Sequence, residues 1–144
     1  MPKINTATLP RPAAIIETRI FTDDRVPGAE LTVTLKASAE FGDMLDVTDL
    51  GERLVHNYAQ NTSPPVSLGK KKIKITPALC MAIATIMTMQ QGGPDECYEA
   101  EDWFRISVAM PAAMSQIYLW ASDLLKRTST VEKDDDGKPQ VPNG

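Results

Sequence analysis

The sequence has few of the residues that build catalytic or metal centres. Its 144 residues include one histidine, His56, and two cysteines, Cys80 and Cys97. Two cysteines make no disulfide framework, and no further cysteine or histidine stands at the spacing of a four-ligand zinc site. Glycine-rich nucleotide-binding loops and nucleophile elbows are also missing. We therefore expect a protein that is not an enzyme and that needs no metal and no cofactor.

Long hydrophobic runs and an excess of positive charge are missing as well. The longest apolar segment, residues 77–89, is shorter than the roughly 18 residues that a membrane span needs. The first residues lack the apolar core of a signal peptide. The net charge is −4, from 15 basic and 19 acidic residues, which is unlike a nucleic-acid binder. We expect a cytoplasmic protein with neither membrane nor nucleic acid as a partner.

The length corresponds to one domain. Residues 1–14 contain three prolines among small and polar residues, which predicts an extended N-terminal arm. Residues 15–127 contain the periodic apolar patterns and form the predicted single globular domain. Residues 128–144 are polar and acidic and have no aromatic residue, so we expect a disordered tail.

The first structured part of the chain has the period of two that is typical of strands. Leu31, Val33 and Leu35 alternate with polar residues. Ile16, Thr18 and Ile20 alternate with Glu17 and Arg19 in the run before them. The turn-forming residues 22–28 separate the two runs. This pattern predicts a β-hairpin with a long loop.

The rest of the chain predicts helices. Residues 38–61 contain two apolar faces, which we interpret as a short helix, a break near residues 47–48 and a second helix, with Ser38 or Asp49 as N-cap candidates. Thr76 and Pro77 predict the start of a helix over residues 77–91. A last helical region, residues 99–127, is divided by Pro111. The fold class is therefore α+β, an N-terminal hairpin followed by a mostly α bundle of three to four helices.

Isolated polar groups could carry chemistry, but each has a simpler interpretation. His56 has only Glu52 one turn earlier as a partner, and we interpret it as a surface residue. Acidic residues recur every three positions between Asp43 and Glu52, which is typical of the solvated side of a helix. The lysines of residues 70–74 are interpreted as a solvated loop or short strand. Cys80 is interpreted as a small buried apolar residue.

Methionine is the most suggestive feature of the helices. Helix 77–91 is apolar almost all round, so other elements must cover nearly every side of it. Methionine side chains are flexible and suit surfaces that fit varied partners. A core helix and a partner-facing helix both remain open. The candidate partner-binding residues are Met81, Met87, Met89, Met110, Met114 and Tyr118.

Three stretches resemble the tail assembly chaperones of long-tailed bacteriophages. They are a strand that leads into an acidic helix (residues 31–46), a short apolar helix (residues 77–89), and a helix that opens Met110-Pro111 and ends in Leu124-Leu125. The resemblance implies a small, mostly helical, non-enzymatic factor of the host bacterial cytoplasm. Such a factor coats the helical tape-measure protein, keeps it soluble and helps tail tube subunits assemble around it, as a homo-oligomer in our expectation.

Two other functions remain open. A structural virion component, such as a minor capsid or tail-completion protein, would stay in the particle, whereas a chaperone would leave it. A small phage inhibitor of a host protein would use a charged face, which the methionine-rich helices do not favour.

Overall fold

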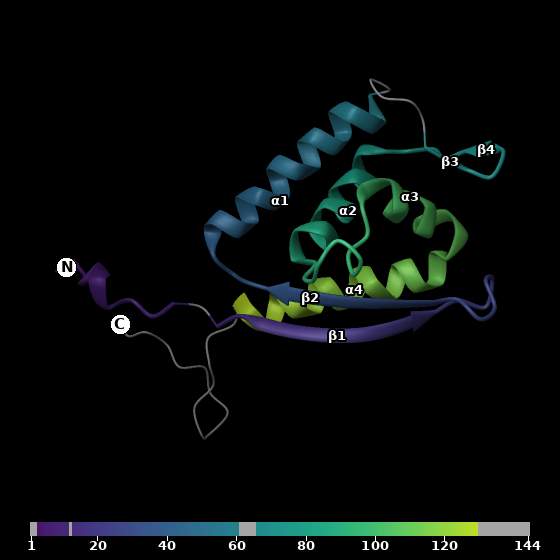
Figure 1. Ribbon diagram of the computed structural model, residues 1–144. Coiled ribbons are helices and arrows are strands. Elements are labelled where there is room, and N and C mark those ends of the chain that lie inside the picture. The colour runs from purple at the N-terminus through teal and green to yellow at the C-terminus, as the bar shows by residue number, and fades with distance from the viewer. Residues whose placement is uncertain (1–2, 12, 61–65, 130–144) are drawn as a thin grey trace.

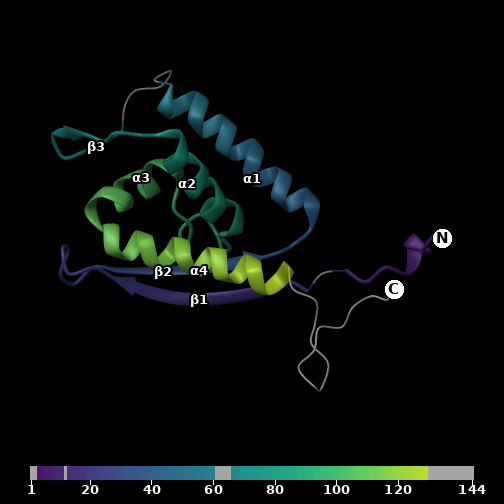
Figure 2. The same cartoon turned by 180° about the vertical axis from the view of Figure 1, so that it is seen from behind.

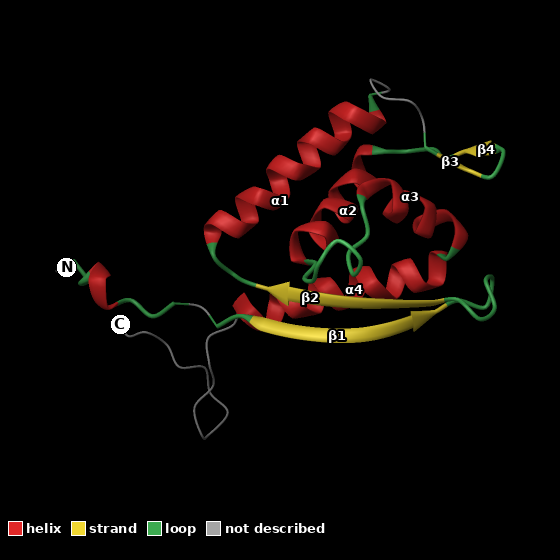
Figure 3. Cartoon of the chain, viewed as in Figure 1, coloured by secondary structure: helices red, strands yellow, loops and turns green. Residues whose placement is uncertain are grey.

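The computed structural model describes residues 3–11, 13–60 and 66–129. It confirms the α+β class: across these residues an N-terminal antiparallel hairpin precedes four α-helices. Figures 1 and 3 show the arrangement, in which helix α4 lies along the hairpin, helices α2 and α3 occupy the middle, and helix α1 lies across α2 on the side away from the hairpin.

The predicted hairpin is formed by β1 (Ile15–Thr22) and β2 (Glu30–Ala37), paired so that Thr18 lies opposite Thr34. Every second residue of β2 is buried, from Leu31 to Ala37, which explains the strict alternation in the sequence. In β1 only Phe21 is fully buried. The hairpin therefore packs one face on the helices and leaves the other in solvent.

Helix α1 (Phe41–Leu54) continues without interruption into a π-helical turn, Val55–Ala59. The predicted break near residues 47–48 is wrong, because a β-branched residue lowers helix propensity only slightly and the Thr48 hydroxyl bonds the Met44 carbonyl at 3.4 Å. The N-cap is Glu40, so Asp49 caps nothing. Asp49 lies inside the helix, where it forms an ion pair with Arg53 at 3.4 Å.

Helix α2 (Pro77–Met89) begins as predicted. The Thr76 hydroxyl accepts a hydrogen bond from the Leu79 N–H at 3.2 Å, and proline occupies the first turn. Before it, the lysine-rich segment forms a two-residue pairing of β3 (Ser67–Leu68) with β4 (Lys71–Lys72), and the lysines are exposed. The Arg105 side chain donates to the Ser67 carbonyl at 3.1 Å and holds this small hairpin on α3.

Pro111 separates α3 (Ala100–Ala109) from α4 (Pro111–Ser129), as predicted. Helix α4 runs past the expected domain end at residue 127, and Thr128 is buried, so the folded domain is longer than predicted. The rest of the predicted tail, residues 130–144, lies outside the described residues.

The start of α4 is held by a residue that is distant in the sequence. Asp23, in the hairpin loop, is buried and accepts hydrogen bonds from the Ala112 and Ala113 N–H groups at 2.9 and 3.2 Å. It also accepts one from Arg25 N–H at 3.0 Å. These hydrogen bonds, that from Arg25 first, lower the pKa of the Asp23 carboxyl against the opposing effect of burial. Asp23 therefore caps α4, because Met110, the residue before Pro111, has no side-chain oxygen that could accept these hydrogen bonds.

The core lies between the hairpin and the helices. Trp103 and Phe104 of α3 are fully buried, together with Ile83 and Ile86 of α2 and Ile117 of α4. Helix α2 contacts α1, α3, α4 and β2, so it is enclosed as its all-round apolar sequence requires. Figure 2 shows the same enclosure from behind.

The described part of the N-terminal arm is exposed and carries one 3-10 turn, Thr6–Thr8. It leads away from the helices (Figure 1). Arg11 forms an ion pair with Glu40, next to the start of α1. This exposed pair joins the described part of the arm to the body of the protein.

Candidate protein-binding site

The six predicted partner-binding residues do not form one surface. Met89, Met110 and Met114 are buried in the core, and Met87 is half-buried. Met81 and Tyr118 are exposed, on α2 and α4 respectively. The three buried methionines therefore fill space in the core: Met89 at the end of α2, Met110 between α3 and α4, and Met114 in the first turns of α4. Partner binding by Met81 and Tyr118 stays a prediction.

Met81 lies where α1 crosses α2. A Cβ atom added at Gly51 of α1 would collide with the Met81 thioether and would approach the Ala84 Cβ to 3.6 Å. Glycine at this position thus leaves room for the end of the Met81 side chain between the two helices. The C-terminal half of α1 packs on the body of the protein, with Gly51 and Leu54 buried.

The N-terminal half of α1 differs, because it exposes large apolar side chains. Phe41, Met44 and Leu45 are 73%, 55% and 52% exposed. Their spacing of i, i+3 and i+4 places them on one side of the helix. We call these three residues the apolar stripe. It lies on the side of α1 opposite to Leu50 and Leu54, which pack on the body of the protein.

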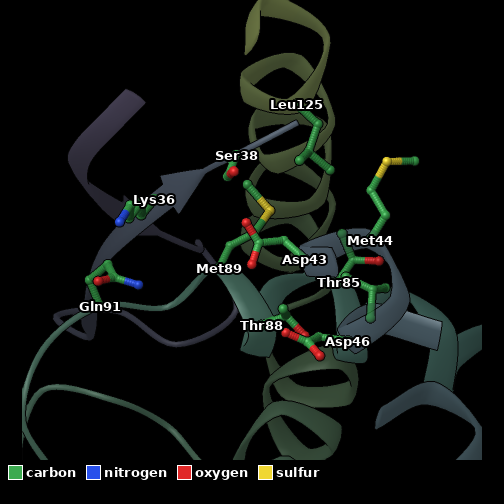
Figure 4. Close-up of a pocket in the computed structure, with 11 residues that line it drawn as sticks. Lys36, Ser38, Asp43, Met44, Asp46, Thr85, Thr88, Met89, Gln91 and Leu125 are labelled. Atoms are coloured by element: carbon green, nitrogen blue, oxygen red, sulfur yellow. The ribbon is translucent and has the colours of Figure 1, made fainter. Parts of the chain in front are cut away.

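On the body-facing side of α1, and meeting the apolar stripe at Met44, lies a pocket of about 360 Å³, which we call the α1–α2 pocket. This volume falls within the range of ligand-binding pockets. Figure 4 shows that its walls come from the end of β2, the first turns of α1, the end of α2 and the last turns of α4. It is lined by Lys36, Ser38, Asp43, Met44, Asp46, Val47, Thr85, Thr88, Met89, Gln91 and Leu125.

Met44 belongs to both features and joins the apolar stripe to the pocket. The pocket floor is apolar, with Met89 buried below it. Two carboxylates of α1, Asp43 and Asp46, stand against one ammonium, that of Lys36. The pocket is therefore an apolar cleft with a net negative rim.

The two threonine hydroxyls of the pocket donate within their own helix, whereas the Ser38 hydroxyl accepts a hydrogen bond from the Glu40 N–H at 3.3 Å. Thr85 donates to the Met81 carbonyl at 3.0 Å, and Thr88 donates to the Ala84 carbonyl at 2.8 Å. Each hydroxyl keeps a lone pair that can accept a hydrogen bond. The Gln91 side chain donates to the Gln90 carbonyl at 2.9 Å. The pocket can thus accept hydrogen bonds from a ligand more readily than it can donate them.

The other sequence candidates show no common site. His56 is exposed on the π-helical turn, and Cys80 is fully buried, where burial raises the pKa of its thiol. The Cys97 thiol donates weakly to the Gly92 carbonyl at 3.5 Å. Within the described ranges no three His, Cys, Asp or Glu side chains come together as a metal site would require. In the same ranges no helix has the length and apolarity to cross a membrane.

Sequence reasoning missed the apolar stripe, although a signal for it was present. Phe41, Met44 and Leu45 lie on a different helical face from Leu50 and Leu54, and we interpreted the difference as a break in the helix. Because the helix is continuous, the same difference means that α1 has two apolar faces. Only one of them packs on the body of the protein.

Comparison of the chain with protein families, with curated proteins and with solved structures finds no match.

Proposed function

We propose that this protein is a tail assembly chaperone that binds an amphipathic helical segment of a phage tape-measure protein. The binding surface is the apolar stripe together with the α1–α2 pocket. The sequence resemblance to such chaperones supports the choice of partner. The exposure of Phe41, Met44 and Leu45 supports the choice of this side of α1 as the binding surface.

One observation carries the proposal. A helix that is firmly packed on one side presents three large apolar side chains to solvent on the other, Phe41, Met44 and Leu45. Burying side chains of this kind is worth about 1.5–3 kcal/mol each when fully accomplished. Contiguous exposed apolar residues beside a pocket are typical of interaction surfaces. A helix that lies in such a groove inserts apolar residues at i, i+3, i+4 and i+7.

The charges of the site specify the chemistry of the partner. Asp43 and Asp46 give the pocket its negative rim, and Asp49 and Glu52 extend the acidic side along α1. A complementary helix carries lysine or arginine beside its apolar face. We therefore expect the bound segments to be amphipathic helices with basic flanks, repeated along the rod. Several copies of the chaperone then cover one tape-measure chain.

The proposed protein acts by covering surface and not by catalysis. In the host bacterial cytoplasm it keeps the tape-measure protein soluble until tail tube subunits replace it. Release requires only moderate affinity at each segment, which suits a shallow site with one pocket. No cofactor takes part.

Co-expression with the tape-measure protein of the same phage tests the proposal. The rod protein should stay soluble and co-purify with several copies of this protein. The double variant Met44→Lys/Leu45→Lys should lose most of this effect, since it places charge on the apolar stripe. Val108→Lys is the matched control, because Val108 is an exposed apolar residue on α3, away from the pocket.

Equal solubility of the rod protein with and without this protein would contradict the proposal. Mass spectrometry of purified particles then distinguishes the structural alternative. A chaperone is absent from mature particles, and a minor virion component is present in them.

A further inference from the structure

Strand β1 has an edge with no hydrogen-bonded neighbour among the described residues. Its sheet contains only β1 and β2. The other edge of β2 is covered, because Gln91 N–H donates to the Thr34 carbonyl at 2.9 Å and Leu35 bridges to Gln90. Figures 1 and 2 both show β1 at the border of the fold. An open edge can pair with another strand through its free N–H and C=O groups.

The register of the hairpin identifies the groups that face this edge. The Thr34 carbonyl points away from β1, toward Gln91. Thr18 and Thr34 are therefore a non-hydrogen-bonded pair of the antiparallel ladder, with their side chains close together. Their hydroxyl groups lie 2.7 Å apart, as expected for such a pair. It follows that Thr18 directs its N–H and C=O outward, and that Ile16 and Ile20 do the same.

We propose that two copies of this chain pair antiparallel through β1, with the twofold axis at Thr18. The sequence Ile16-Glu17-Thr18-Arg19-Ile20 is self-complementary about its centre. In this register Ile16 lies opposite Ile20 of the second copy, and Glu17 lies opposite Arg19. The two hairpins then form one four-stranded sheet.

The outer face of the sheet supports this register. Ile16 and Ile20 are 62% and 61% exposed on the solvent side of β1. Pairing places each isoleucine beside the other across the new strand boundary, and β-branched cross-strand pairs stabilise sheets. Each isoleucine is thus shielded on the side that faces the second copy.

The charged residues on the inner face of β1, Glu17 and Arg19, also support the register centred on Thr18. The Arg19 guanidinium lies 3.4 Å from Glu17 and stacks 5.2 Å from the centre of the Trp120 ring, while its side chain is 53% exposed. Glu17 accepts hydrogen bonds from Trp120 at 3.0 Å and Arg127 at 2.8 Å. A second copy brings a further Arg19 to each Glu17. Opposite charges directly across two strands are favourable, and like charges are unfavourable.

Neighbouring registers lose this complementarity. A twofold axis of an antiparallel pair can pass through a hydrogen-bonded or a non-hydrogen-bonded pair, so each residue of β1 is a possible centre. An axis at Glu17 or at Arg19 would place two like charges directly opposite each other, which is unfavourable. An axis at Ile16 would place Glu17 opposite Ile15, and an axis at Ile20 would place Arg19 opposite Phe21. The axis at Thr18 is the one that pairs each charged residue with its opposite.

Sedimentation of the full chain over a range of concentrations tests the proposal. Wild-type protein should show a monomer–dimer equilibrium. The double variant Ile16→Lys/Ile20→Lys should weaken the dimer at least tenfold and keep the far-ultraviolet circular dichroism of the wild type. Thr32→Lys is the matched control, because Thr32 is exposed on the same face but on β2. A wild-type protein that is monomeric throughout, or a dimer that is unaffected by the double variant, overturns the proposal.

Disulfide formation tests the register. In a Cys97→Ser background, with Cys80 buried, Thr18→Cys should form a covalent dimer on mild oxidation. Directly opposite residues of a hydrogen-bonded pair have Cα atoms about 5.5 Å apart, within disulfide range. Thr22→Cys, four residues from the axis, should not. Equal yields from both variants would contradict pairing at Thr18. The Met44→Lys/Leu45→Lys variant should still dimerise, so failure of this proposal is distinguishable from failure of the proposed function.

Discussion

Helices α1 and α2 are both rich in apolar residues, yet they use them differently. Helix α2 is enclosed by α1 with its π-helical turn, α3, α4 and β2, and Ile83, Ile86 and Met89 are buried. The first turns of α1 point Phe41, Met44 and Leu45 into solvent. The difference lies in coverage and not in composition. The candidate interaction surface therefore lies on α1, which is covered on one side only, and not on the more hydrophobic α2.

The largest expected effect is in α2. Ile86→Ala should lower the free energy of unfolding by about 2–5 kcal/mol, because it leaves a cavity at a fully buried site. Urea denaturation followed by circular dichroism measures the change. A cost below about 1 kcal/mol would mean that α2 is not enclosed in the way described.

Helix α4 extends the comparison, because its start is capped by Asp23, a residue far away in the sequence. Asp23→Ala should lower the melting temperature by several degrees at pH 7, since it removes the acceptor for two N–H groups of α4. Calorimetry measures the loss. An unchanged melting temperature would show that this hydrogen-bond set does not stabilise the fold.

The same carboxyl group gives a pH dependence. Its pKa is lowered in the folded protein, so its stabilising contribution is complete above the ordinary value of 3.8 and is lost as the pH falls through the lowered pKa. The difference in melting temperature between wild type and Asp23→Asn should therefore be constant near neutral pH and shrink below pH 3.8. A difference that grows on acidification would contradict the assignment.

Helix starts sharpen the contrast between α1 and α2. Thr76→Ala should cost about 1 kcal/mol, because it removes the side-chain cap of α2. Glu40, the N-cap of α1, makes no capping hydrogen bond with its side chain, so Glu40→Ala removes no cap. Thermal unfolding of both variants checks the comparison. Equal losses of stability in the two variants would indicate that the Thr76 cap does not stabilise α2 more than Glu40 stabilises α1.

The smallest expected effect is on the apolar stripe itself. Met44→Lys should change the free energy of unfolding by less than about 0.5 kcal/mol, because the side chain is mostly exposed. A larger loss would show that Met44 supports the fold, and binding defects of this variant would then have a structural cause.

The sequence predicts most of the fold because local signals agree with it. The alternation of β2, the Thr76-Pro77 start and the break at Pro111 each depend on neighbouring residues alone. Three features depend on distant contacts and could not be found in this way. They are the capping of α4 by Asp23, the burial of Met89, Met110 and Met114 in the core, and the close approach of α1 to α2 at Gly51.

The candidate site was less predictable than the fold. Periodicity shows which residues share a helix face, but it does not show which face another element covers. The methionines of α2 and of the Pro111 region suggested a partner surface from their chemistry, but Met89, Met110 and Met114 are packed in the core. Phe41 and Leu45 were recognisable only as a second apolar face of α1.

Hydrogen exchange of this protein, free and bound to its tape-measure protein, tests the central claim most directly. The free chain should exchange quickly in the first turns of α1, because one side of these turns is open to solvent. Binding should slow exchange at residues 41–48 and 85–91, and leave residues 100–109 of α3 unchanged. Protection confined to α3, or no protection in α1, would contradict a partner site on the apolar stripe and the α1–α2 pocket.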